Sequence, residues 1–293
     1  MRGRCAHNRM TSGLPRFGGV ALLIVAALSL GVAPHVRAEE PAAPAKKTAD
    51  CPRGAFRVVL DVGHTIDSPG ADSARGVPEY QFNLALADVI KEALVKAGFD
   101  NTVRMITTTG HLAGLVERAT RANAMHADLF IALHHDSVPD KLIEKWEYNG
   151  ETHQFSDRFS GYSIFVSSEN GDFNGSLAFG HLLGTALQAR GLHYTPHYTM
   201  PLMGHYRHML VDPEAGVYRY DLLVVLRETR MPAVLLEAGS IVNRQDELTL
   251  ATPERRALVA DAITTAVENF CAERARPVSA SVPAPLRPSA QAR

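Results

Sequence analysis

Cysteine, tryptophan and net charge are all scarce in this sequence. Only three of its 293 residues are cysteine and one is tryptophan, while 30 basic residues stand against 31 acidic ones. Three cysteines are too few for a fold held together by a disulfide framework. A net charge near zero does not favour nucleic acid as a partner. The hydrophobic content of 46% is ordinary for a globular protein, and the chain is long enough for a large core.

Long hydrophobic runs are also lacking, with one exception at residues 18–33. Several arginines precede this run and the small-residue stretch 36–38 follows it, which is the order found in a secretory signal peptide. We therefore expect cleavage after Ala38, with residues 1–38 as signal peptide and a soluble periplasmic protein without stable membrane insertion. A membrane anchor is the alternative, although the run is short for a spanning helix.

The remaining chain divides into two biased ends and one domain. Residues 39–50 form a Pro/Ala linker, and residues 273–293 are expected to be a disordered tail rich in Pro, Ala, Ser and Arg. This leaves one domain at residues 51–272. Cys51 and Cys271 are the two cysteines left after signal removal, and we expect them to form a disulfide in an oxidising compartment.

Apolar runs typical of buried strands alternate with helical periodicity along the domain. The sequence predicts strands at 58–62, 103–106, 128–133, 162–167 and 232–236, and helices at 79–97, 112–125 and 177–190 and from Pro253 onward. Strands that alternate with helices favour a single α/β domain with a twisted, mostly parallel sheet and helices on both faces.

Polar residues follow three of the predicted strands. His64 and His134 come directly after apolar runs, as does Glu237, and Glu79 opens the first helix. The carboxyl ends of parallel strands meet at one edge of a sheet, so these residues can lie together although they are far apart in sequence. Two histidines and a carboxylate are a known ligand set for catalytic zinc. Scattered surface residues remain an equal alternative from spacing alone, since no local HExxH motif is present.

At these residues the chain resembles the zinc-dependent N-acetylmuramoyl-L-alanine amidases, also called amidase type 3, over residues 57–271. The blocks that carry the resemblance are Leu60-Asp61-Val62-Gly63-His64-Thr65 with Pro69-Gly70-Ala71, Glu79 with Asn83-Leu84, Leu133-His134-His135-Asp136, and Pro232-Ala233-Val234-Leu235-Leu236-Glu237 with Gly239.

The resemblance implies an enzyme that hydrolyses the amide bond between N-acetylmuramic acid and L-alanine in peptidoglycan or soluble muropeptides. It implies Zn²⁺ as cofactor, with His64, Glu79 and His134 as metal ligands and Glu237 as the catalytic acid/base that activates a metal-bound water. Two other functions stay open at this point, namely a zinc peptidase that cuts elsewhere in the stem peptide and a non-catalytic peptidoglycan-binding module. An activator protein also stays open as a partner.

Other histidines compete with this assignment. His135 is adjacent to His134, but neighbouring strand residues point to opposite faces, so we expect His135 to be a buried hydrogen-bonding group. A second group contains His193, His197, His205 and His208. Their spacing does not fit one helix face, which favours solvated loop histidines over a second metal site.

Residues 139–160 form an unusually long connection after the strand that leads to His134. It contains the only tryptophan, Trp146, and we interpret it as a lid or substrate-contacting insertion. The alternatives are an inhibitory plug, in which Glu144, Glu147 or Glu151 reaches the metal, and a self-packed surface loop.

Overall fold

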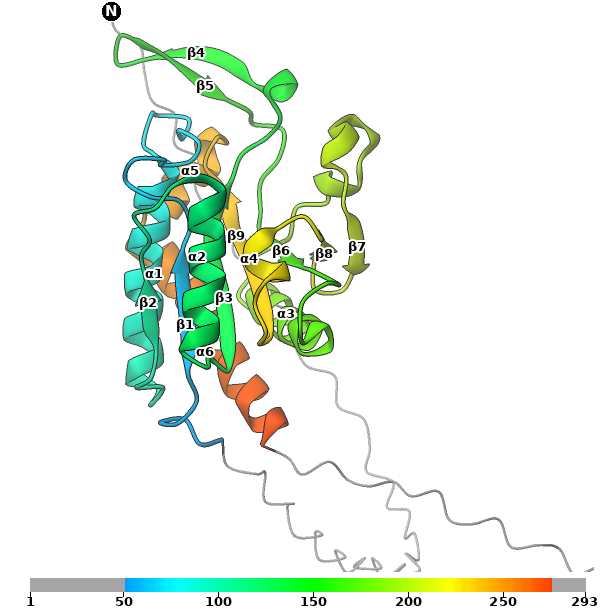
Figure 1. The fold of residues 1–293 in the computed structure, drawn as a ribbon. Helices are drawn as coiled ribbons and strands as arrows, with labels where there is room; N and C mark the ends of the chain where they lie inside the picture. The colour runs from blue at the N-terminus through cyan, green and yellow to red at the C-terminus, as the bar shows by residue number, and fades with distance from the viewer. Residues whose placement is uncertain (1–50, 276–293) are drawn as a thin grey trace, which may run out of the picture. The chain divides into compact units, whose positions relative to one another are not determined.

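The structure is a computed structural model and describes residues 51–275 (Figure 1). The expected signal peptide (1–38), the linker (39–50) and the tail from residue 276 onward lie outside these residues. The strands are β1 (Val58–Val62), β2 (Val103–Met105), β3 (Leu129–Asp136), β4 (Glu144–Tyr148), β5 (Glu151–Phe155), β6 (Ser163–Val166), β7 (Met209–Asp212), β8 (Val217–Arg219) and β9 (Ala233–Ser240). The helices are α1 (Glu79–Lys96), α2 (His111–Ala124), α3 (Phe173–Gln188), α4 (Val224–Arg227), α5 (Arg244–Leu250) and α6 (Pro253–Arg274), with 3-10 turns η1 (Asp140–Leu142), η2 (His197–Thr199) and η3 (Pro201–Tyr206).

One seven-stranded sheet has the order β2-β1-β3-β9-β6-β8-β7. Strands β2, β1, β3 and β9 are parallel to one another. Strand β6 runs antiparallel to β9 but parallel to β8, and β7 is antiparallel to β8. The predicted α/β domain with a mostly parallel sheet is therefore confirmed, with antiparallel pairing confined to the β9–β6 and β8–β7 junctions.

Helices cover both faces of this sheet, as predicted (Figure 1). Alternate residues of the central strands, such as Leu60, Ile131 and Leu236, pack with α1, α3 and α6. The intervening residues, such as Phe130 and Leu235, pack on the other face with α2 and α4. Complete burial of one such side chain contributes roughly 1.5–3 kcal/mol, so the central strands hold their ends rigidly. None of the described helices is long and apolar enough to cross a membrane.

The connection at 139–160 contains a hairpin that the sequence analysis missed. Strands β4 and β5 pair antiparallel around a two-residue turn. Asn149 and Gly150 in this turn both have positive φ, at 54° and 84°. Asn-Gly is the strongest short-range hairpin signal because its type I′ turn matches the twist of the strands, so the sequence did carry this information. The predicted helix at 177–190 begins earlier, at Phe173, because the Asp172 side chain caps it through the backbone N–H of Gly175.

The two ends of the domain are joined covalently. Cys51 and Cys271 form a disulfide, which confirms the predicted pairing, and their Cα atoms are 5.3 Å apart. Cys271 lies near the end of α6, which continues to Arg274 and so extends past the expected domain end at residue 272. The bond therefore ties the segment before β1 to the helix that packs against α1 and α3.

Replacing Cys51 and Cys271 together by alanine is expected to lower the free energy of unfolding by about 2–5 kcal/mol. The physical reason is that the bond spans 220 residues and restricts the unfolded chain. Denaturant unfolding of wild type and variant, each with and without reductant, measures the difference. Reductant should lower the stability of the wild type only, and equal stability of both oxidised proteins would contradict the prediction.

Candidate metal centre

Three neighbouring strands bring the predicted site residues to one place. His134 lies near the end of β3, and its register partner on β9 is Glu237. His64 follows β1, which pairs with β3 on its other side. Glu79 is the first residue of α1. The structure therefore brings together all four residues that the sequence singled out, although Glu237 lies within β9 rather than after its end.

The turn after β1 needs glycine at a position of close approach. A Cβ atom on Gly63 would lie 2.4 Å from Nε2 of His134, so a larger residue would displace that ring. The backbone N–H of Gly63 donates to the carbonyl oxygen of Leu133 at 3.0 Å, which holds the turn against β3. His64 itself has a φ of 68°, a left-handed conformation that a non-glycine residue rarely adopts. This turn directs the His64 ring towards Glu79.

The Glu79 carboxylate lies between the two histidine rings. Its Oε2 is 2.8 Å from His64 Nε2, and its Oε1 is 2.9 Å from His134 Nδ1. One ligand atom from each of the three residues falls within 4.8 Å of the others. Burial acts to raise the pKa of Glu79, but its hydrogen bonds with His134 and His64 outweigh burial and hold the pKa well below its usual range. The side chain is therefore a carboxylate that faces two imidazoles.

Asn83, one helical turn after Glu79, holds the Glu79 carboxylate in place through hydrogen bonds. Its amide nitrogen donates to Glu79 Oε1 at 3.1 Å and to the carbonyl oxygen of Gly63 at 3.2 Å. Its amide oxygen is 2.7 Å from Nδ1 of His135. Burial lowers the pKa of His135 to about 3, so the ring is neutral. The expectation that His135 is a buried hydrogen-bonding group is confirmed.

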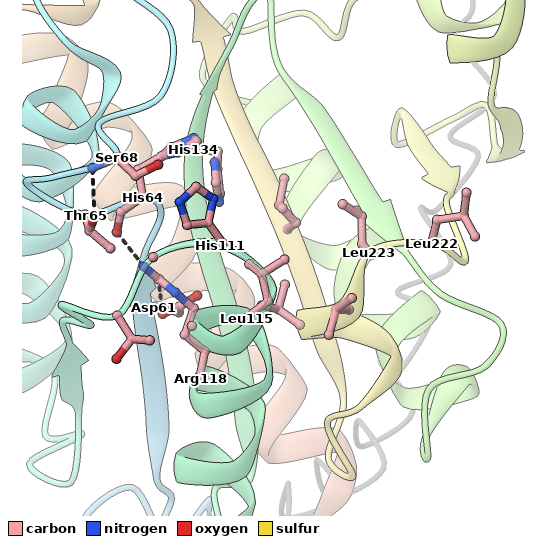
Figure 2. Close-up of a pocket in the computed structure, with 16 residues that line it drawn as sticks. Asp61, His64, Thr65, Ser68, His111, Leu115, Arg118, His134, Leu222 and Leu223 are labelled. Atoms are coloured by element: carbon pink, nitrogen blue, oxygen red, sulfur yellow. Dashed lines mark hydrogen bonds and ion pairs between the residues drawn. The ribbon is translucent and has the colours of Figure 1, made fainter.

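A buried ion pair holds the backbone of the β1 turn. Arg118 of α2 contacts Asp61 at 2.7 Å, and both side chains are almost fully enclosed. The same guanidinium donates to the carbonyl oxygen of Val62. It also donates to the carbonyl oxygen of His64 (Figure 2). Burial raises the pKa of Asp61 to about 6 although Arg118 acts in the opposite direction. Asp61 carried part of the family resemblance in the sequence, but its pairing with Arg118 was not predicted.

Glu237 differs from the other site residues because its side chain lacks a polar partner. Its Oε2 atom is buried and forms no hydrogen bond with the described residues. Burial raises the pKa of Glu237 well above its usual range, and the nearby charges of Asp136 and Glu79 raise it further. A poorly solvated carboxyl of this kind is typical of a proton-transfer group.

A second polar group lies beside Asp136, and it corrects one expectation. His197 is only 1% exposed, so it is not a solvated loop residue. Its ring stacks on Phe159, and its Nδ1 is 2.6 Å from the hydroxyl of Thr195. The hydroxyl of Tyr198 donates to Asp136 at 2.7 Å. Tertiary packing of η2 against the sheet buries this histidine, and helical spacing carries no information about such packing.

A pocket of about 260 Å³ adjoins the two histidines. His64 and His134 line one side, and the apolar residues Leu222 and Leu223 lie opposite (Figure 2). Leu115 of α2 completes the apolar wall. A concave apolar surface next to a few convergent polar groups is the usual form of a substrate site.

The hairpin packs over the loop that precedes Glu79. Trp146 donates through its indole nitrogen to the carbonyl oxygen of Ala74 at 2.8 Å, and Arg75 and Arg244 both lie over its ring. The three hairpin glutamates, Glu144, Glu147 and Glu151, are exposed and do not belong to the ligand group. These contacts do not support the plug interpretation, because they hold the hairpin against Ala74 and Arg75 of the loop between β1 and α1.

Comparison with known proteins agrees with this geometry. A family model described as N-acetylmuramoyl-L-alanine amidase matches residues 58–269. The Bacillus subtilis (strain 168) protein YqiI is 26% identical over 248 residues, which is 85% of this chain and 95% of that protein.

Solved structures share the fold. The N-acetylmuramyl-L-alanine amidase Ami1 of Mycobacterium smegmatis matches with a TM-score of 0.56 and 19% identity over 75% of this chain and 98% of its own. The catalytic domain of CwlV, an N-acetylmuramoyl-L-alanine amidase from Bacillus (Paenibacillus) polymyxa var. colistinus, matches with a TM-score of 0.53 and 23% identity, covering 73% and 97%.

The burial of His197 implies that the free energy of unfolding depends on pH in a specific way. Burial, and secondarily His208, lowers its pKa from 6.5 to about 4. Between these values the unfolded chain binds a proton that the folded chain does not, so this residue lowers the free energy of unfolding as the pH falls. His197→Gln should reduce that fall by on the order of 3 kcal/mol.

Denaturant unfolding of both proteins between about pH 7 and about pH 4 measures this difference. The comparison of two curves is needed because raised carboxyl pKa values, such as that of Asp61, act in the opposite direction. His205→Gln changes an exposed histidine of the same connection and should follow the wild-type curve. Parallel curves for His197→Gln and wild type would contradict the prediction.

Proposed function

The chain belongs to the N-acetylmuramoyl-L-alanine amidase family, and from this premise we propose that it hydrolyses the amide between N-acetylmuramic acid and L-alanine in peptidoglycan with a bound zinc ion. The observation that carries the proposal is the convergence of His64, Glu79 and His134, whose ligand atoms lie within 4.8 Å of one another. Two imidazoles and one carboxylate fit zinc, and three protein ligands leave a position for substrate or water.

The residues present therefore fit the metal that the family implies. His64, Glu79 and His134 would hold it, and Asn83 would keep the Glu79 carboxylate in place through the 3.1 Å hydrogen bond. When bound, zinc polarises a substrate carbonyl and lowers the pKa of water.

Glu237 is the proposed acid/base of the reaction. It would accept the proton of the attacking water and return it to the nitrogen of the leaving L-alanine. Burial and the charges of Asp136 and Glu79 raise its pKa well above the usual range, and a cation at the neighbouring ligands would favour its ionised form. Glu237 thus acts as a base when zinc is bound, and as an acid once it has accepted the proton of the water.

We propose further that the enzyme acts in the periplasm. The Cys51–Cys271 disulfide supports this location because such bonds persist in oxidising compartments. The substrate is peptidoglycan or a soluble muropeptide.

Analysis of reaction products tests the proposed bond. Digestion of purified peptidoglycan by the zinc-loaded protein should release glycan chains free of peptide, together with peptides that begin with L-alanine. Peptides cut elsewhere in the stem would indicate a zinc peptidase instead. An absence of soluble products, with binding to peptidoglycan retained, would indicate a binding module.

Site variants separate metal binding from proton transfer. His64→Ala and His134→Ala each remove a ligand and should lose zinc and activity together. Glu237→Gln keeps the three ligands and should retain zinc, but its turnover should fall by about 10²–10⁴-fold because the amide cannot accept a proton. Zinc analysis and kinetics on a soluble muropeptide measure both properties.

His181→Ala serves as a control for histidine removal. His181 pairs with Asp212 at a distance of 2.7 Å and does not belong to the ligand group, so its variant should keep zinc and activity. Loss of zinc from Glu237→Gln would make Glu237 a ligand. Hydrolysis by Glu237→Gln near the wild-type rate would remove it as the acid/base.

A further inference from the structure

A row of polar side chains crosses three neighbouring strands on one face of the sheet. His134 on β3 is the register partner of Glu237 on β9, and Glu237 is in turn the register partner of Ser163 on β6. The next residues along the same face, Phe165 and Leu235, belong to the core under α2 and α4. The row therefore continues from a metal ligand, through the acid/base, to a serine.

Ser163 is an unusual residue for its place. Its strand is otherwise apolar, and Ser163 itself is 0% exposed. Its hydroxyl forms no hydrogen bond with any of the described residues. Most buried polar atoms in folded proteins have a partner, so an unpaired hydroxyl here needs an explanation.

The atom that complements this hydroxyl lies directly across the strand pair. Glu237 Oε2 is the buried carboxylate oxygen that also lacks a partner among the residues the structure describes. Directly opposed residues of an antiparallel pair have Cβ atoms about 4.5–5.5 Å apart and project from the same face. A serine hydroxyl can donate, whereas an ionised carboxylate can only accept.

The other groups around Glu237 are not suited to this task. Asp136 acts on Glu237 as a like charge and accepts a hydrogen bond from the hydroxyl of Tyr198. The Nδ1 atom of His134 already contacts Glu79. Ser163, by contrast, has a hydroxyl without a partner among the described residues, and this hydroxyl can turn towards Glu237 about a single bond.

We propose that Ser163 is a positioning residue for Glu237, whose hydroxyl donates to Oε2 when substrate is bound. The inference rests on the proposed role of Glu237 as acid/base. Hydrogen bonds of catalytic groups are often long without substrate and shorten in the complex. A donor on one oxygen fixes the rotation of the carboxylate, so that the other oxygen faces the attacking water.

Ser163→Ala tests this inference because it removes only the hydroxyl. It should lower kcat on a soluble muropeptide by roughly tenfold, since hydrogen bonds to charged groups are among the stronger ones. KM, zinc content and the midpoint of thermal unfolding should stay at wild-type values, because the hydroxyl forms no hydrogen bond with the ligands or with another described residue. A residue with a purely structural role would instead change the unfolding midpoint.

Ser156→Ala is the matched control. Ser156 is also 0% exposed with an unpaired hydroxyl among the described residues, but it lies outside the β6–β9 pair. Its variant should keep the wild-type kcat. An unchanged kcat in Ser163→Ala, an equal loss in Ser156→Ala, or a loss accompanied by release of zinc would overturn the proposal.

The Glu237→Gln variant separates a failure of the proposed role of Ser163 from a failure of the proposed acid/base role of Glu237. If Glu237→Gln is inactive and zinc-loaded while Ser163→Ala has the wild-type kcat, the proposed function stands and the role of Ser163 is wrong. If Glu237→Gln is fully active, the acid/base assignment fails and the role of Ser163 fails with it.

Discussion

The contact of one carboxylate with two imidazoles is the constraint on which the site depends. Glu79 must reach His64 and His134 at once, at 2.8 Å and 2.9 Å. This arrangement requires glycine where the backbone passes close to the carboxylate. A Cβ atom on Gly70 would lie 2.5 Å from Glu79 Oε2. The arrangement also requires the start of α1 to face the end of β1, which Asn83 secures by bonding to Glu79 and to the backbone of Gly63.

Electrostatics explains why a cation suits this place. Glu79 at the start of α1 acts as a like charge on Asp136 of β3, and both act on Glu237 of β9. Burial and these like charges raise the pKa of Asp136 to about 7 and that of Glu237 well above its usual range. Buried carboxylates are unfavourable unless a positive charge or donors offset them. The proposed zinc ion supplies that charge, and the proposed Ser163 hydrogen bond supplies a donor at the far side of Glu237.

Local patterns in the sequence were sufficient for the frame of this fold, whereas the choice of site residues also needed the resemblance to a known family. Apolar runs identified β1, β3 and β9, and the polar residues that follow or end them indicated His64, His134 and Glu237. The antiparallel insertion of β6 beside β9 depends on pairing between segments that are distant in sequence. Hydrophobic periodicity and residue propensity do not encode such pairing. The same reason applies to Ser163, whose relation to Glu237 exists only through strand register. Burial of His197 likewise results from tertiary packing.

The coordination of zinc by Glu79 and the two histidines is the central claim, and X-ray absorption at the zinc edge measures it most directly. The zinc-loaded wild type should hold one equivalent of zinc with two imidazole ligands, additional oxygen donors and no sulfur. Glu79→Ala should bind zinc more weakly, because it removes the carboxylate that both rings contact. A spectrum with sulfur or with a different number of imidazoles, or unchanged zinc affinity in Glu79→Ala, would contradict the account.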